Sequence, residues 1–167
     1  MPREHILIVD DERAIQATLR AVLEDEGYRI TSVGSAPDAL TKLADETPDL
    51  IFLDIWMPGM DGLEALAEIK QRQPETTVVM ISGHATIETA VKATKLGAYD
   101  FIEKPLSLEK TLLAVSRALE HSRLERENRA LREQLDRGQQ IVGKSALIEE
   151  LRGQIAVAAP TNGRVLI

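Results

Sequence analysis

The 167-residue sequence contains no cysteine, so neither a disulfide framework nor thiolate chemistry can contribute to its fold or activity. It also contains no apolar run near the ~18 residues that a membrane-spanning helix needs. The apolar run Ile6–Val9 is too short for a secretory signal and leads directly into acidic residues. These absences predict a protein that acts in the cytoplasm and away from membranes.

Basic side chains are too few to balance the acidic ones. The chain has 20 lysines and arginines against 27 aspartates and glutamates, which gives a formal net charge of −7 and argues against strong nucleic-acid binding by this chain. Residues 1–120 carry 21 acids and 12 bases (−9), whereas residues 121–167 carry 6 acids and 8 bases (+2). We therefore expect an acidic body followed by a unit with a different role.

Five short apolar or β-branched runs recur at fairly even intervals in the acidic body. Their lengths suit strands better than helices, and several are almost continuously apolar, as in a parallel sheet covered on both faces. The runs are Ile6–Val9, Tyr28–Val33, Leu50–Leu53, Thr77–Ile81 and Tyr99–Ile102. Stretches with helical spacing lie between them, the last of which carries an apolar stripe made of Ile87, Ala90, Val91 and Ala93. This alternation predicts an α/β flavodoxin-like (βα)5 fold, a doubly wound parallel sheet with strand order 2-1-3-4-5.

The last helix of the body is predicted to be unusually long. Ser107 to about Arg137 contains neither glycine nor proline, and Gly138 is expected to close the helix. A first apolar stripe should cover the sheet: Leu108, Leu112, Val115 and Leu119. A second stripe has heptad spacing: His121, Leu124, Asn128, Leu131 and Leu135. We interpret residues 121–138 as a helical linker that forms a two-stranded coiled coil with Asn128 fixing its register, and a solvated spacer helix is the alternative.

The remaining residues, 139–167, are too few to bury a core of their own. Their pattern predicts a turn, a helix containing Leu147, Leu151 and Ile155, and a strand that begins at Arg164. A chain that stops within an apparent strand is expected to be a fragment of a longer protein.

Polar and charged side chains follow four of the predicted strands at the point where each strand ends. Asp10, Asp11 and Glu12 follow the first strand, Asp54 the third, Ser82 the fourth and Lys104 the fifth. The carboxyl ends of parallel strands meet at one edge of the sheet, and the first and third strands are neighbours in this fold. We therefore expect the three aspartates to lie close together.

Three adjacent carboxylates repel one another unless a cation lies among them, and oxygen ligands favour a hard ion such as Mg²⁺. Lys104 would add a positive charge and Ser82 a hydroxyl, which suits phosphoryl transfer. Asp54 stands alone at its strand end and is the best nucleophile candidate, so an acyl phosphate is the expected product. Taken singly, an acid could be a helix cap, Ser82 part of a turn and Lys104 a surface lysine. The prediction therefore depends on their conjunction.

Residues 1–120 resemble the receiver domain of bacterial two-component response regulators. The resemblance is carried by Ile6–Glu12, Leu53–Gly62, Ile81–His84 and Phe101–Pro105. It implies that Asp54 accepts a phosphoryl group from a sensor histidine kinase. It also implies that Asp11, Asp54 and the backbone carbonyl of Trp56 bind Mg²⁺, with Asp10 binding through water.

The resemblance assigns roles to residues at the other strand ends as well. Lys104 would pair with the phosphoryl group, and the Lys104–Pro105 peptide bond would be cis. Phosphorylation would draw the Ser82 hydroxyl inward, and the Phe101 ring would follow. That switch would remodel the surface of the fourth helix, fifth strand and fifth helix, through which, together with the linker helix, a homodimer would form. A phenylalanine lacks the hydroxyl that a tyrosine would offer a partner, and a plain core aromatic is the alternative for Phe101.

The C-terminal residues resemble the start of the AAA+ domain in sigma-54 activators of the NtrC class. The stretches concerned are Ile141–Ser145 and Arg164–Ile167. Residues 139–167 would then be the truncated N-terminal edge of that domain. Its phosphate-binding loop would come after the last residue given, so the fragment is not expected to bind or hydrolyse ATP.

Within this class, the body looks most like the NtrX branch. The stretches concerned are Ser82–His84, Ile87–Ala90 and Gly97–Pro105. This resemblance implies a membrane-bound kinase of the NtrY type as partner. It also implies a longer parent protein that binds DNA, although this fragment would not.

Two other functions are compatible with the acidic cluster. A small phosphatase could use an aspartyl-phosphate intermediate, but such enzymes usually carry a second acid two residues after the nucleophile, where this chain has Trp56. A receiver that serves as a constitutive dimerisation module, without control by phosphorylation, is the other alternative.

Overall fold

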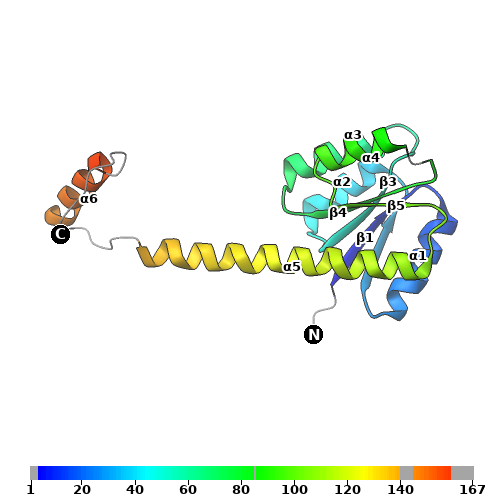
Figure 1. Cartoon of the computed structure of the whole chain (residues 1–167), viewed down its shortest axis with the longest axis horizontal. Coiled ribbons are helices and arrows are strands. Elements are labelled where there is room, and N and C mark those ends of the chain that lie inside the picture. Colours follow the sequence, from blue (N-terminus) through cyan, green and yellow to red (C-terminus); the bar gives the residue numbers. More distant parts are fainter. Residues whose placement is uncertain (1–3, 85, 140–144, 159–167) are drawn as a thin grey trace. The chain divides into compact units, whose positions relative to one another are not determined.

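The computed structural model describes residues 4–84, 86–139 and 145–158, and it divides into two units, Met1–Arg126 and Glu127–Ile167. The strands, all in the first unit, are β1 His5–Val9, β2 Arg29–Val33, β3 Leu50–Asp54, β4 Thr77–Ser82 and β5 Asp100–Glu103 (Figure 1). Helices alternate with them as α1 Arg13–Asp25, α2 Ala36–Asp45, α3 Gly62–Arg72, α4 Ile87–Lys95 and α5 Leu108–Gln139, and α6 Ala146–Ala158 follows in the second unit. None of the described helices combines the length and apolar character that crossing a bilayer requires.

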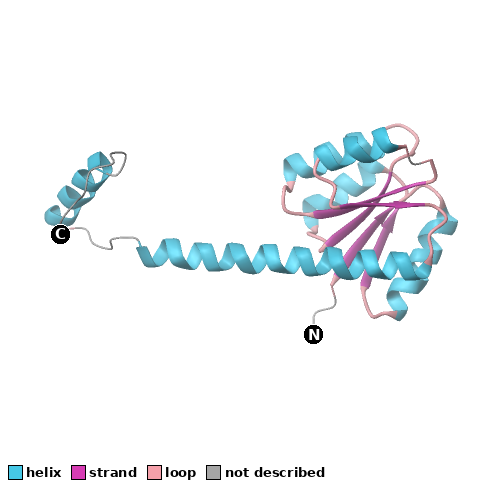
Figure 2. Ribbon diagram, in the orientation of Figure 1, coloured by secondary structure: helices cyan, strands magenta, loops and turns pink. Residues whose placement is uncertain are grey.

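The five strands form one parallel sheet in the order β2-β1-β3-β4-β5, which confirms the predicted fold (Figure 2). Every strand pair is parallel, and the register places Leu53 of β3 between Val9 of β1 and Met80 of β4. Because the strands run in one direction, β1, β3 and β4 deliver their carboxyl ends to the same edge of the sheet.

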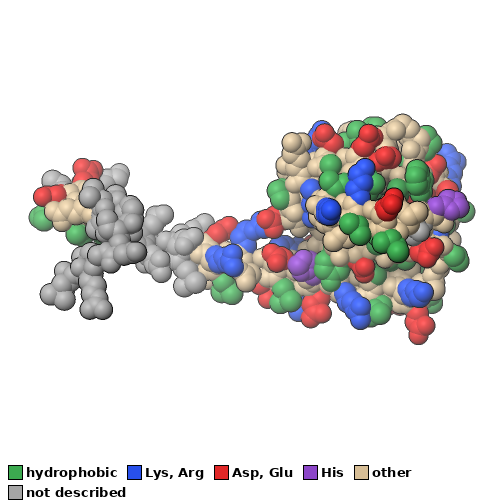
Figure 3. Space-filling view, turned by 45° about the horizontal axis from the view of Figure 1, so that its top comes forward, with side chains coloured by type: hydrophobic (Ala, Val, Ile, Leu, Met, Phe, Trp, Pro, Cys, Tyr) green, Lys and Arg blue, Asp and Glu red, His purple; other side chains and the backbone are tan. Residues whose placement is uncertain are grey.

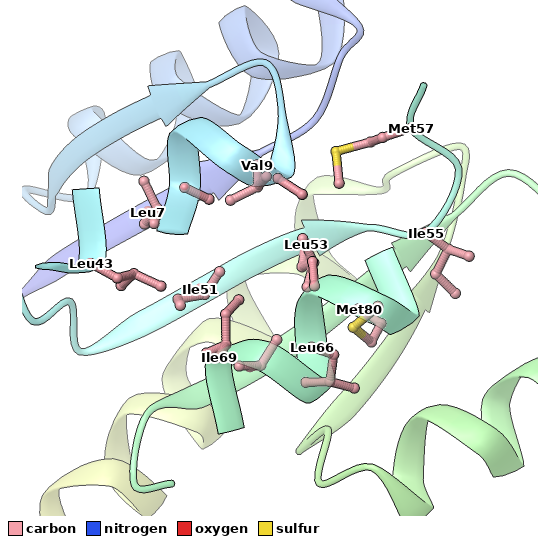
Figure 4. Close-up of a cluster of buried hydrophobic side chains, with 14 of the residues drawn as sticks. Leu7, Val9, Leu43, Ile51, Leu53, Ile55, Met57, Leu66, Ile69 and Met80 are labelled. Carbon is pink, nitrogen blue, oxygen red and sulfur yellow. The ribbon is translucent and has the colours of Figure 1, made fainter. Parts of the chain in front are cut away.

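Successive strand residues point to opposite sides of the sheet, and helices bury both sides. Helices α2, α3 and α4 cover the face that carries Ile51, Leu53 and Met80 (Figure 4). Helices α1 and α5 cover the other face, where Phe52 and Ile8 are completely buried. The continuous apolar character of these strands in the sequence follows from this double cover.

Two helices end on glycines with positive φ, a conformation that side chains disfavour. Gly27 follows α1 with φ 92°, and Gly97 follows α4 with φ 98°. At each end the amide of the next residue donates back into the last turn, from Tyr28 N to Leu23 O and from Ala98 N to Ala93 O. The turns fix where β2 and β5 begin.

Helix α5 differs from the prediction at both ends. It continues through Gly138 to Gln139. Its first residue, Leu108, is 58% exposed and does not cover the sheet, whereas the rest of the predicted stripe does: Val115 and Leu119 are buried, and Leu112 packs against the same cluster. The predicted stripe of α4 is also largely uncovered: Ala93 is buried, whereas Ile87 and Val91 are exposed.

Helix α6 confirms the predicted helix of the C-terminal unit. Its apolar residues Leu147, Leu151 and Ile155 are exposed within the described part of the chain. The predicted strand at Arg164 lies outside the described residues.

Candidate functional site

The carboxyl edge of the sheet carries the predicted acidic cluster. Asp54 is the last residue of β3, and Asp10 directly follows β1; both side chains are buried, whereas Asp11 is exposed. Backbone hydrogen bonds beyond the strand ends hold this edge, from Ile55 N to Ile81 O (3.0 Å) and from Asp10 N to Val33 O (3.2 Å). One carboxylate oxygen from each of Asp10, Asp11 and Asp54 lies within 4.8 Å of the others.

Gly62 brings the start of α3 against the end of β3. Its amide donates to Ile55 O (2.8 Å), and a Cβ built on Gly62 would overlap the carbonyl oxygen of Asp54. The preceding residue, Asp61, caps α3 by accepting hydrogen bonds from Leu63 N and Glu64 N. The loop after Asp54 is therefore anchored at both ends, which fixes the position of the Asp54 carboxylate.

Lys104 reaches the cluster from the end of β5. Its Nζ lies 3.0 Å from Asp10 Oδ2 and 3.2 Å from Asp54 Oδ1. The backbone of Lys104 is held in place, because its amide donates to Ser82 O (2.8 Å). Its peptide bond to Pro105 is cis, as the resemblance predicted. The structure thus joins residues from β1, β3 and β5 that lie far apart in the sequence.

Glu12 is a member of the site that the sequence reasoning missed. Its Oε1 accepts a hydrogen bond of 2.9 Å from Lys104 Nζ. The signal in the sequence is its place directly after Asp10 and Asp11 in one acidic run.

The electrostatics of the cluster favour a bound cation. Burial, together with the nearby charge of Asp10, raises the pKa of Asp54 to about 6, and burial also raises the pKa of Asp10. Burial alone would lower the pKa of Lys104, but its hydrogen bonds with Glu12 and Asp10 outweigh this effect and raise that pKa. The lysine therefore stays charged, and its single positive charge faces several carboxylates.

The donor atoms present fit a hard divalent ion. Asp10 Oδ2 and Asp54 Oδ1 are buried and accept no well-aligned hydrogen bond within the described part of the chain, although Lys104 Nζ is near both. Buried carboxylate oxygens without such partners are costly unless a cation lies beside them. An all-oxygen donor set suits Mg²⁺.

Three other predicted site residues lie on β4 and β5 and in the loop after β3. Ser82 is buried at the end of β4, where its Oγ accepts a hydrogen bond from His84 N (3.2 Å). Phe101 is partly buried and packs against the core on the α2–α3–α4 face. Trp56 follows Asp54 by two residues, and its side chain is 58% exposed. No direct contact of these three side chains with the aspartates is among the described interactions.

A parallel (βα)5 sheet that gathers three aspartates and a lysine at its carboxyl edge is the architecture of a receiver domain of two-component signalling. Residues 6–116 match the family described as the response regulator receiver domain, and the chain belongs to that family. Within it the chain is of the NtrX type, in the NtrC class.

Comparisons with relatives support this placement. The chain is 51% identical, over 97% of its length, to the nitrogen assimilation regulatory protein NtrX of Azorhizobium caulinodans, of which it covers 36%. A crystal structure of NtrX from Brucella abortus is similar with a TM-score of 0.75 and 46% identity, over 98% of this chain and 36% of that one. The beryllofluoride-activated NtrC4 receiver domain dimer is similar with a TM-score of 0.68 and 42% identity, over 71% of this chain and 98% of that one. The chain spans about a third of the length of its full-length relatives.

Proposed function

We propose that this chain is the phosphoryl-accepting part of a two-component transcriptional regulator and that Asp54 receives the phosphoryl group from a sensor histidine kinase of the NtrY type. The observation that carries the proposal is the cluster of Asp10, Asp11 and Asp54 beside Lys104. Identity to NtrX relatives supports the choice of kinase class.

In the proposed reaction, a carboxylate oxygen of Asp54 attacks the phosphorus of a phosphohistidine. The P–N bond breaks and leaves its electron pair on the imidazole nitrogen, while the new P–O bond makes an acyl phosphate. Lys104, 3.2 Å from Asp54 Oδ1, is placed to offset the charge that the phosphoryl group brings. Positioning of the reacting groups and neutralisation of charge would therefore account for most of the rate of phosphoryl transfer.

The metal would be held by the residues that the family resemblance assigns. Asp11, Asp54 and the backbone carbonyl of Trp56 would bind Mg²⁺ directly, and Asp10 would bind it through water. When bound, the ion supplies positive charge that attracts the phosphoryl oxygens. Asp10 Oδ2 and Asp54 Oδ1 support this assignment, because both are buried, accept no well-aligned hydrogen bond in the described part of the chain and share the single charge of Lys104.

Phosphorylation would be transmitted by Ser82 and Phe101 to the surface formed by α4, β5 and α5. Exposed apolar side chains on α4 and α5 support a role for this surface in self-association: Ile87, Val91 and Leu113. On the face visible in Figure 3, acidic and basic side chains are interspersed among hydrophobic ones. A homodimer through this surface and the linker helix is the proposed output, and the NtrC4 relative is a receiver dimer by its description.

The organisation of the longer protein follows from the same proposal. Residues 1–120 would be the receiver, residues 121–138 a linker with coiled-coil character, and residues 139–167 the beginning of an AAA+ domain. DNA binding would belong to a further domain of the parent protein rather than to this part.

Intact mass spectrometry after incubation with Mg²⁺ and acetyl phosphate tests the proposed chemistry. The wild-type chain should gain one phosphoryl group, and Asp54→Asn should gain none. Asp45→Asn, which removes an exposed acid of α2, is the matched control and should behave as wild type. A phosphorylated Asp54→Asn, or a wild type that gains nothing, would contradict the proposal. Sustained turnover of a phosphomonoester would instead support a phosphatase, and phosphorylation with an unchanged oligomeric state would support a constitutive dimer module.

A further inference from the structure

Glu12 is bound to the lysine of the site although it is exposed. Of the three carboxylates around Lys104 Nζ, Glu12 makes the shortest contact, a hydrogen bond of 2.9 Å, whereas Asp10 and Asp54 lie at 3.0 and 3.2 Å. Glu12 alone accepts a hydrogen bond from Lys104 Nζ in the described part of the chain, whereas the contacts with Asp10 and Asp54 are ion pairs. A newly arriving anion therefore competes with Glu12 for a donor and for the charge of Lys104.

The position of Glu12 in the chain shows that its side chain is directed to Lys104 rather than to its own helix. Glu12 is the N-cap residue of α1, yet its side chain caps none of the helix amides. The N-cap residues of α2, α3 and α4 are Ser35, Asp61 and Thr86, and each accepts a backbone N–H of its helix. A short polar side chain is preferred at an N-cap. Glutamate at this position instead reaches a residue that is 92 positions away in the sequence.

Glu12 is also the carboxylate that can leave at least cost. The side chains of Asp10 and Asp54 are 0% and 3% exposed, whereas that of Glu12 is 59% exposed. On release, the Glu12 carboxylate can be hydrated by bulk water, but the buried aspartates would lose their charged partner without such compensation.

We propose that Glu12 is a positioning residue that holds Lys104 in the unphosphorylated protein and competes with the phosphoryl group for it. This inference rests on the function proposed above. A phosphoryl group brings about two negative charges and three acceptor oxygens, which replace the Glu12 carboxylate at Lys104 Nζ. Removal of the competitor therefore strengthens the binding of a phosphoryl mimic and accelerates phosphorylation of Asp54.

The test is a titration of the full chain with beryllofluoride at fixed Mg²⁺. The readout is the fluorescence of Trp56, which is the single tryptophan and lies two residues after Asp54. The initial rate of phosphorylation by acetyl phosphate, measured by intact mass, gives a second readout. Glu12→Gln should bind beryllofluoride about two- to five-fold more tightly, because an exposed ion pair contributes little more than that. Glu24→Gln, which removes an exposed acid of the same helix, should match wild type.

Glu12→Asp separates competition for the lysine from general repulsion of an anion. Aspartate keeps the negative charge but is one methylene shorter, and at an N-cap it turns to the helix amides. It should therefore resemble Glu12→Gln in both readouts. If Glu12→Gln does not differ from wild type, or if it binds more tightly while Glu12→Asp equals wild type, the competition is refuted. A wild type that neither binds beryllofluoride nor gains a phosphoryl group would refute the proposed function itself.

Discussion

At the scale of single residues, the burial of Asp54 makes the stability of the metal-free protein depend on pH. The pKa of this carboxyl is about 6 in the folded state, against 3.8 ordinarily, because burial and the charge of Asp10 disfavour its ionised form. The folded protein therefore binds more protons than the unfolded chain between about pH 4 and 6, and stability falls as the pH rises through that window. This loss of folding stability persists at neutral pH, where the Asp54 carboxyl is ionised in both states.

Asp54→Asn should remove this penalty. In EDTA at pH 7.5, urea denaturation should show a gain in the free energy of unfolding on the order of 2 kcal/mol. The gain should shrink at pH 4, where the wild-type carboxyl is protonated in the folded state and already partly protonated in the unfolded chain. Asp45→Asn should show no such pH-dependent gain, since this residue is exposed on α2. A gain for Asp54→Asn that is equal at both pH values would rule out carboxylate burial as its cause.

The members of the site differ in how far the sequence predicts them. Asp10, Asp54 and Lys104 follow from strand order alone, because parallel strands deliver their last residues to one edge. Glu12 does not follow, since its contact depends on the rotamer of a long side chain that reaches Lys104 from the start of α1. Local sequence cannot distinguish such a glutamate from a hydrated one.

At the scale of elements, the backbones of β3 and α3 approach each other closely beside the site. A Cβ at Gly62 would overlap Asp54 O and lie 2.7 Å from Ile55 Cα, and neither backbone atom can move without displacing the end of β3. Gly62→Ala should therefore lower the free energy of unfolding by about 2 kcal/mol or more, in the range of overpacked sites. Urea denaturation measures this change.

Gly34→Ala is the matched control for that substitution. Its added Cβ would have as its nearest neighbour Gln16 Nε2 at 3.7 Å, an ordinary contact with a side chain. This variant should stay within about 1 kcal/mol of wild type, apart from the small effect of replacing a glycine. Equal stability of the two variants would show that the β3–α3 junction relaxes without cost.

Hydrophobic periodicity in the sequence predicted the strands better than it predicted the buried faces of the helices. Apolar runs located all five strands to within about a residue, because both faces of the sheet are covered and every residue of β1, β3 and β4 is buried. Helical stripes were less informative: Ile87, Val91 and Leu108 fit their stripes but are exposed. Periodicity identifies an apolar face, but it does not tell whether that face covers this sheet or is left for another surface.

At the scale of the whole molecule, α5 continues beyond the part that packs on the sheet. Ser122 is still buried, and Arg126 Nη1 lies 2.6 Å from Asp49 Oδ1. Arg126 is the last residue of the first unit, so α5 contacts the rest of that unit as far as this position. Leu124 and Leu131 are 52% and 60% exposed, seven residues apart on the same helix. This spacing places both leucines on one side of the helix, as a coiled-coil contact with a second chain requires.

If the linker helix pairs in a dimer, removal of both leucines should weaken self-association. Burial of a leucine contributes about 1.5–3 kcal/mol, so Leu124→Gln with Leu131→Gln should raise the dimer dissociation constant at least about tenfold in sedimentation experiments. Glutamine keeps the helix propensity, so circular dichroism should not change. The matched control is Leu147→Gln with Leu151→Gln on α6, where exposed leucines are also removed but outside the heptad stripe. If both double variants associate as wild type does, the extension of α5 is a solvated spacer, and any dimer must form through the surface of α4, β5 and α5.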